Sequence, residues 1–107
     1  MTTIEKGGGL LTLINVFTVE PEKQHVLVAM LIEATEKTMK HMPGFVSANI
    51  HSSLDGKRVV NYAQWADIAS FEAMRKDPRA IPHMQAAASL AHAEPILCQV
   101  SDVIGHV

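Results

Sequence analysis

The sequence is short of the residues that mark several common classes of protein. It has one cysteine, Cys98, so no disulfide can form within the chain, and a reduced, cytoplasmic setting is expected. The 9 basic and 11 acidic side chains are scattered, without the basic face that is typical of nucleic-acid-binding proteins. No apolar run approaches the ~20 residues of a membrane span, and the N-terminus lacks a signal-peptide pattern. We therefore expect neither nucleic acid nor a membrane as a partner.

What remains is a chain with the composition of one globular domain. It has 107 residues, of which 48% are hydrophobic. Residues 1–9, which end in Gly7-Gly8-Gly9, are expected to form a flexible N-terminal lead, and residues 10–107 a single domain. A domain of this size buries only roughly 60–65% of the surface that its unfolded chain exposes. A second subunit would therefore help to stabilise it.

Apolar patterning predicts four strands and two helical regions. Runs rich in β-branched and apolar residues predict strands at residues 10–19, 45–54, 58–65 and 95–104. Spacings of three and four predict a helix over residues 21–42, with a buried stripe of Val26, Leu27, Met30, Leu31, Ala34 and Thr38. A second helical region starts near residue 67, breaks at residues 77–78 and resumes over residues 80–92. The order β-α-β-β-α-β predicts an α+β, ferredoxin-like fold, with an antiparallel sheet and both helical regions on one face.

The strongest local signal is the Asp55-Gly56 pair between the second and third strands. A two-residue turn there fixes the register, and side chains of facing residues share one side of the sheet. The pairs expected on the helix-facing side are Leu54–Lys57, Ser52–Val59, Ile50–Asn61, Ala48–Ala63 and Val46–Trp65. The opposite side is mostly polar, so we expect it to face solvent or a wet space between subunits.

Asn61 is the amide on an otherwise apolar side of this hairpin. A buried amide without a partner costs roughly 1–3 kcal/mol, so the backbone, another side chain or a ligand must satisfy it. Trp65 lies on the same side, and the small side chains of Ala48 and Ala63 leave room nearby. A cavity with an aromatic wall and one polar group is typical of a small-molecule site. A purely structural asparagine and tryptophan would give the same pattern.

Several segments carry a resemblance to a known family. They are Pro43-Gly44-Phe45, His51, Asp55-Gly56, the run VVNYAQW from Val59 to Trp65, and Asp77-Pro78-Arg79. In these segments, and from about Leu13 to Val103 overall, the chain resembles the antibiotic biosynthesis monooxygenase family. The likeness is greatest to the small quinone-forming enzymes of aromatic polyketide pathways. The resemblance implies a homodimeric α+β barrel that oxidises a polycyclic phenol to a quinone with molecular oxygen, without metal, flavin or haem.

The implied chemistry assigns roles to particular residues. A phenol or anthrone reacts with oxygen once it is deprotonated, so the protein must bind, deprotonate and stabilise it. Asn61 is suited to donate to a developing oxyanion, and Trp65 to stack on a flat polycycle. The base is either His83 or an oxyanion of the substrate. The other expected substrate-binding residues are Asn15, Ile50, Ala63, Phe71, Met74 and Met84, and no metal ligand is expected. Where the polyketide enzymes carry a hydroxyl-bearing aromatic and an arginine, this chain has Phe71 and Met84.

Two alternatives remain open at this stage. The chain also resembles, more faintly, the haem-degrading monooxygenases of the same superfamily. In that interpretation Asn15 and His83 match a strand asparagine and the iron ligand, while Met74 stands at the helix tryptophan position. The remaining histidines show no metal-binding spacing. The other alternative is a non-catalytic dimer that binds a small molecule, because a fold does not fix a function.

Overall fold

The computed structural model describes residues 1–106. Within this range the strands are β1 (Leu11–Thr18), β2 (Phe45–Ser52), β3 (Arg58–Trp65) and β4 (His92–Cys98). The α-helices are α1 (Gln24–Lys37), α2 (Ile68–Lys76) and α3 (Ile81–Leu90), and short 3-10 turns flank α1 as η1 (Pro21–Lys23) and η2 (Met39–His41). Across the described residues, no helix has the length and hydropathy needed to cross a bilayer.

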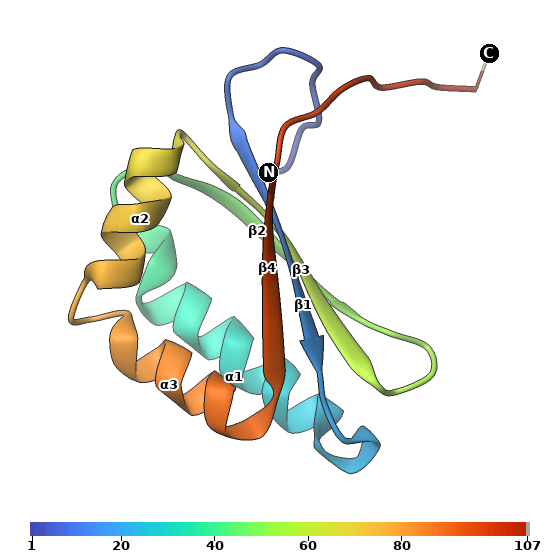
Figure 1. Cartoon of the computed structure of the whole chain (residues 1–107), viewed down its shortest axis with the longest axis vertical. Helices are drawn as coiled ribbons and strands as arrows, with labels where there is room; N and C mark the ends of the chain where they lie inside the picture. The colour runs from blue at the N-terminus through green and yellow to red at the C-terminus, as the bar shows by residue number, and fades with distance from the viewer. Residues whose placement is uncertain (107) are drawn as a thin grey trace.

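The strands form one antiparallel sheet in the order β2-β3-β1-β4. Figure 1 shows the three helices gathered on one face of this sheet. The predicted ferredoxin-like α+β fold is therefore confirmed. The second helical region is divided into α2 and α3, because Asp77 caps the turn through a hydrogen bond from the Arg79 N–H and Pro78 cannot continue a helix.

The hairpin of β2 and β3 keeps the predicted register over most of its length. Ser52 faces Val59, Ile50 faces Asn61 and Ala48 faces Ala63. The turn is longer than predicted, since the last ladder bond runs from the Ser53 N–H to the Arg58 carbonyl and residues 54–57 form the connection. Leu54 is therefore fully exposed in the loop rather than paired with Lys57. The Asp55 carboxylate accepts bonds from the Lys57 N–H and the Ser53 hydroxyl, which favours this wider turn.

A β-bulge changes the other end of the hairpin. The register shifts between Phe45 and Ser47, so Phe45 rather than Val46 lies opposite Trp65. Val46 is the extra residue of the bulge and is 37% exposed. The predicted Val46–Trp65 pair is therefore wrong, and an aromatic ring stands where a valine was expected.

Two other boundaries differ from the predictions. Val26 does not belong to the buried stripe of α1 and is 42% exposed, whereas Leu27 and Ala34 are buried. β4 lies at residues 92–98 instead of 95–104. It ends early because β1 starts at Leu11 and offers no further partner, and it tolerates Pro95 because it is an edge strand paired with β1 alone.

The apolar core between sheet and helices consists of two clusters. One gathers around Trp65 and comprises Leu11, Leu13, Met42, Ala63, Trp65, Phe71, Met74 and Ala80. The other gathers around Leu27 and comprises Phe17, Val19, Leu27, Val59 and Ala87. Both clusters lie against the same face of the sheet, and the site described below is lined by members of both.

The helix-free face of the sheet carries the N-terminal lead at one end. The Asn49 amide donates to the Thr2 hydroxyl at 2.6 Å, and the Gln64 amide donates to the Thr3 carbonyl at 2.7 Å. These bonds seat residues 2–3 on β2 and β3, while the flexibility of the lead as a whole stays a prediction. Beyond β4 the chain leaves the sheet as an extended arm (Figure 1).

Candidate active site

A cavity of about 240 Å³ lies between the sheet and the three helices. This is just below the roughly 300–1,000 Å³ typical of ligand sites, which suits a flat and compact ring system. Most of its wall is apolar. The polar and aromatic residues that line it are Asn15, Phe17, Thr35, Phe45, Asn61, Trp65, Phe71, Arg75 and His83.

The cavity brings together every predicted site residue except Ile50. Asn61, Ala63 and Trp65 come from β3 and Asn15 from β1, while Phe71, Met74, His83 and Met84 come from α2 and α3. Ile50 shares their side of the sheet, but it packs against the cluster around Leu27 and is not a wall of this cavity. Ile50 lies directly opposite Asn61 in the register, so the alternation of β2 placed it on the correct face, but its side chain is turned to the cluster around Leu27.

Two asparagines face each other across neighbouring strands at the floor of the cavity. Asn15 of β1 and Asn61 of β3 are directly opposed in the register. The Asn61 Oδ1 accepts a hydrogen bond from the backbone N–H of Asn49 at 3.3 Å. Since a backbone N–H only donates, the bonded atom of Asn61 is its oxygen. Among residues 1–106 nothing accepts from its NH₂ group, which is available to donate.

Asn15 supplies the complementary group. Its Oδ1 is buried, and no group among residues 1–106 bonds to it. A buried acceptor without a partner is unfavourable by about 1–3 kcal/mol, so a native structure retains one where a ligand or water completes it. The floor therefore offers one donor, on Asn61, beside one acceptor, on Asn15.

Trp65 forms the aromatic wall and is only 2% exposed. Phe45 meets it edge to face at a centroid distance of 5.4 Å, and Phe71 lies at 6.4 Å with an interplanar angle of 64°. Contacts of this kind hold an indole in one orientation. The β-bulge that puts Phe45 opposite Trp65 thus contributes directly to the site.

His83 lies on α3 and is fixed by a contact with α1. Its Nε2 is 3.0 Å from the Thr38 hydroxyl oxygen, where η2 follows α1. In the tautomer that places the proton on Nε2, this nitrogen donates to Thr38 and Nδ1 is left as an acceptor. The geometry is therefore compatible with a base on this wall, as predicted for His83.

Arg75 is the charged residue of the cavity wall, and the sequence analysis missed it, as it missed the polar Thr35 and the aromatic Phe17 and Phe45. It lies on α2 one residue after Met74, and its guanidinium carbon is 5.9 Å from the centre of the Phe71 ring. The spacing of four residues from Phe71 was a signal, because i and i+4 share one side of a helix. A charged residue in a helix is ordinarily solvent-exposed, so this spacing alone does not distinguish a cavity residue from a surface residue.

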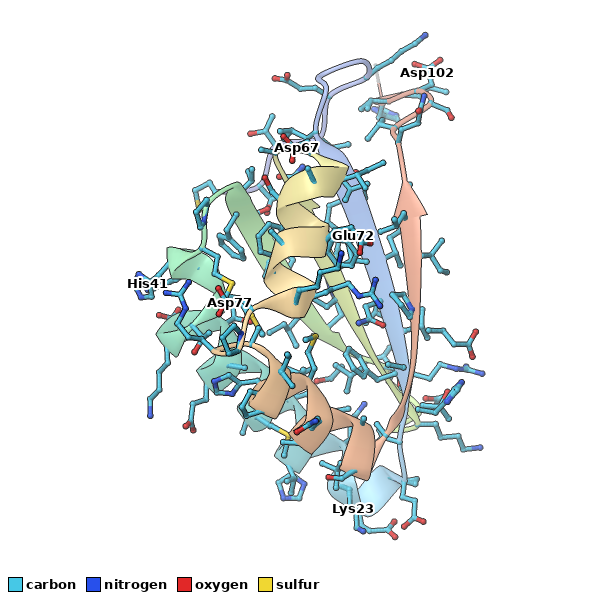
Figure 2. All side chains as sticks on the ribbon, turned by 60° about the vertical axis from the view of Figure 1, so that its left-hand side comes forward. Lys23, His41, Asp67, Glu72, Asp77 and Asp102 are labelled. Atoms are coloured by element: carbon cyan, nitrogen blue, oxygen red, sulfur yellow. The ribbon has the colours of Figure 1, made fainter. Side chains whose placement is uncertain are left out.

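Carboxylates outside the cavity hold α2 and its neighbours in place. Asp67 caps the start of α2 by accepting from the Ser70 N–H at 2.7 Å, and this bond keeps the pKa of Asp67 below its usual range. At the other end of α2, bonds from Arg79 lower the pKa of Asp77 to about 2. Figure 2 shows Asp67 and Asp77 at opposite ends of this helix. These caps position Phe71, Met74 and Arg75 over the sheet.

Comparison with known proteins identifies the family. The sequence model of the antibiotic biosynthesis monooxygenases matches residues 10–90. The chain belongs to this family. It is 50% identical over 105 residues to the tetracenomycin-F1 monooxygenase of Streptomyces glaucescens, covering 98% of this chain and 94% of that protein. The family model and this near full-length identity together make the chain a monooxygenase.

Solved structures of the antibiotic biosynthesis monooxygenase fold agree with this one. A monooxygenase from the gene ActVA-Orf6 of Streptomyces coelicolor, in complex with the ligand nanaomycin D, is 30% identical, with a TM-score of 0.80 over 92% of this chain and 93% of that chain. SnoaB of Streptomyces nogalater, a cofactor-independent oxygenase, is 24% identical, with a TM-score of 0.74 over 92% of this chain and 100% of that chain. At that identity SnoaB supports the fold alone.

Proposed function

We propose that this monooxygenase oxidises a polycyclic phenol of the anthrone type to a quinone with molecular oxygen, without metal, flavin or haem. The observation that carries the proposal is the amide pair at the floor of an apolar cavity, with a free donor on Asn61 and an unpaired acceptor on Asn15. A phenol has one hydroxyl that both donates and accepts, and the two amides match it. The similarity to a tetracenomycin-F1 monooxygenase supports the same substrate class.

The first step is deprotonation of the bound substrate. A flat ring system stacks on Trp65, and its oxygen lies at the amide pair. His83 takes the proton through Nδ1, and Thr38 keeps the imidazole oriented by accepting from Nε2. The NH₂ group of Asn61 donates to the oxyanion that develops, where a preorganised donor in an apolar site is most effective.

The second step is the reaction of the carbanion or phenolate with oxygen. One electron passes from the substrate anion to O₂, and the two radicals combine to form a carbon–oxygen bond. The resulting peroxide anion takes back the proton that His83 had accepted, and the hydroperoxide then loses water, with the hydrogen of the oxidised carbon, to leave a carbonyl group. The balance for the parent compound is anthrone plus O₂ giving anthraquinone plus water, so the substrate supplies every electron and no other reductant takes part.

Haem degradation is the second candidate, and two observations count against it. The relative at 50% identity is named a monooxygenase of tetracenomycin F1 and not of haem. In addition, the Nε2 of His83 is engaged by Thr38 at 3.0 Å, so an iron would have to displace that contact. A haem titration of the wild type and of His83→Ala tests this candidate, because ligation by His83 would give a Soret shift that the variant loses.

The working form is a homodimer in the cytoplasm. The helix-free face of the sheet carries Ile14 and Val16 of β1 beside polar residues of the hairpin, and Ile96 of β4 on this face is 48% exposed. Pairing two such faces would bury these side chains. Cys98 is a free thiol, which fits a reducing compartment.

Oxygen uptake with anthrone tests the enzymatic proposal. We expect Asn61→Ala to lower kcat by about 100-fold, because loss of one oxyanion donor commonly costs 10²–10³. Trp65→Phe keeps the stacking surface and should lose less. Gln85→Ala, which removes an amide from an exposed position of α3, is the matched control and should keep wild-type activity. Uptake that is indifferent to both cavity substitutions would refute the proposal.

A further inference from the structure

The cavity opens between the helices and the edge strand β4. Most of its lining residues are buried or half-buried, and the exposed ones are Arg75 of α2, Ala88 of α3 and Pro95 of β4. These three elements surround the mouth. Arg75 is therefore a mouth residue, whereas Asn15 and Asn61 lie on the sheet at the floor.

Arg75 is held in place from two sides. The Phe71 ring, itself only 5% exposed, lies beneath the guanidinium at 5.9 Å. Glu72 accepts bonds from Nη1 alone, at 3.2 Å and 3.1 Å to its two oxygens. In Figure 2 Glu72 lies on the side of α2 turned toward β4, which is the side of the mouth. The position of the guanidinium is thus largely set before any ligand arrives.

One edge of this guanidinium is free. Within residues 1–106, neither Nε nor Nη2 of Arg75 bonds to another group, and together they present two parallel N–H donors. Arg79, two residues after Asp77, provides a contrast to Arg75. Its Nε and Nη2 both donate to the Asp77 carboxylate. The parallel donors of Arg79 are occupied, and those of Arg75 remain available.

We infer that Arg75 is the receptor for a carboxylate carried on the edge of the substrate. The inference rests on the proposed function and names its substrate class: a polycyclic phenol that bears a carboxylic acid. The parallel N–H donors match the two oxygens of a carboxylate. An acid held at the mouth would direct the opposite edge of the ring system inward, toward the amide pair on β1 and β3. Arg75 thereby selects both the substrate and the ring carbon that is oxidised.

The plainer explanation is an ordinary surface ion pair, and it accounts for only part of the geometry. The Arg75–Glu72 pair joins side chains that are 53% and 38% exposed, and such pairs contribute little to stability. That explanation gives no reason for a guanidinium packed on a cavity aromatic with its bidentate edge unused. A role in stabilising the ionised phenol is less suited to a residue at the mouth than to Asn61 at the floor.

Binding of two matched ligands tests the inference without turnover. Anthraquinone-2-carboxylate and the neutral anthraquinone-2-carboxamide differ in charge at one edge, and neither can be oxidised by this route. Trp65 is the single tryptophan of the chain and lines the cavity, so quenching of its fluorescence reports binding. We expect Arg75→Gln to weaken the carboxylate by about tenfold, discounted for the exposure of the site, and the carboxamide by less than about twofold.

Further variants distinguish bidentate recognition by the parallel N–H donors of Arg75 from simple attraction to its positive charge. Arg75→Lys keeps the charge but loses the parallel donors, so it should bind the carboxylate more weakly than wild type. Glu72→Gln removes the competing anion and should tighten carboxylate binding. Arg79→Gln removes the same charge from a guanidinium whose parallel donors are occupied. It keeps the backbone N–H that the Asp77 cap accepts, so it should leave both affinities unchanged. Equal weakening by Arg75→Gln and Arg79→Gln, or equal weakening of both ligands, overturns the inference.

The outcomes also separate this inference from the proposed function. If the carboxylate binds through Arg75 but the wild type consumes no oxygen with anthrone, the subsite stands and the proposed reaction falls. If anthrone is oxidised while Arg75→Gln leaves carboxylate binding intact, the reaction stands and the subsite falls. If neither anthraquinone quenches Trp65, the cavity does not take this ring system and both fall.

Discussion

Asn15 has opposite effects on stability and on activity: it lowers the stability of the fold but contributes to the proposed reaction. Its amide oxygen is buried without a partner among the described residues, at the floor of the cavity. Leucine has nearly the same shape and no polar atom to leave unsatisfied. We expect Asn15→Leu to raise the free energy of unfolding by about 1 kcal/mol or more while lowering oxygen uptake. Urea denaturation with an unchanged m-value measures the first effect.

Asn61→Leu is the matched control for that prediction. The Asn61 oxygen accepts from the Asn49 N–H, so its removal leaves a backbone donor without a partner. This variant should therefore lose stability as well as activity. Equal stability changes in the two leucine variants would contradict the difference that we assign to the two amides.

The residues of the site differ in how far sequence could reveal them. Asn61 and Trp65 were predictable because strand alternation and the register of the hairpin placed them on the buried face. The contacts that orient the site were not predictable. They join residues far apart in the chain, such as Thr38 with His83, and they depend on the packing of α1 against α3. The availability of Nε and Nη2 of Arg75 was likewise not predictable, because it depends on Glu72 accepting from Nη1 alone.

At the scale of elements, the hairpin shows both the strength and the limit of local signals. Asp55-Gly56 fixed the register from Ser52 to Ala48, although the turn that forms is wider than two residues. The bulge at Val46 had no local signal. It follows Gly44, whose φ of +83° suits glycine, and the close approach of Ser70 to this position leaves no room for a side chain. The bulge beside this packed glycine determines which residue meets Trp65.

The turn between α2 and α3 should respond to acid. Bonds from the Arg79 side chain and backbone lower the pKa of Asp77 from 3.8 to about 2. A depressed carboxyl pKa contributes stability that is complete above about pH 4 and is lost as the pH falls toward 2. We expect the wild type to be more stable than Asp77→Asn at neutral pH, and the difference to shrink across this window. Thermal unfolding of both proteins from pH 6 to pH 2 measures it, and a constant difference would contradict the assignment.

At the scale of the whole molecule, the exposed sheet face predicts association. β4 is an edge strand whose Ile96, on the open face, is 48% exposed, and a chain of 11.7 kDa can build only a small hydrophobic core. We expect sedimentation to give a mass near twice 11.7 kDa. Ile96→Lys on the open face should weaken the association, while Ile68→Lys, on exposed α2, should not. A wild type that stays monomeric at micromolar concentration would count against the dimer.

The division of the core into two clusters has a consequence for the packing of the enzyme when no substrate is bound. Members of both clusters line the cavity, so without a ligand the apolar interior contains an unfilled space between them. A flat substrate would fill this space and join the clusters around Trp65 and Leu27 into one continuous apolar core. We therefore expect bound substrate to stabilise the folded state and, by filling the cavity, to keep water away from the reactive anion.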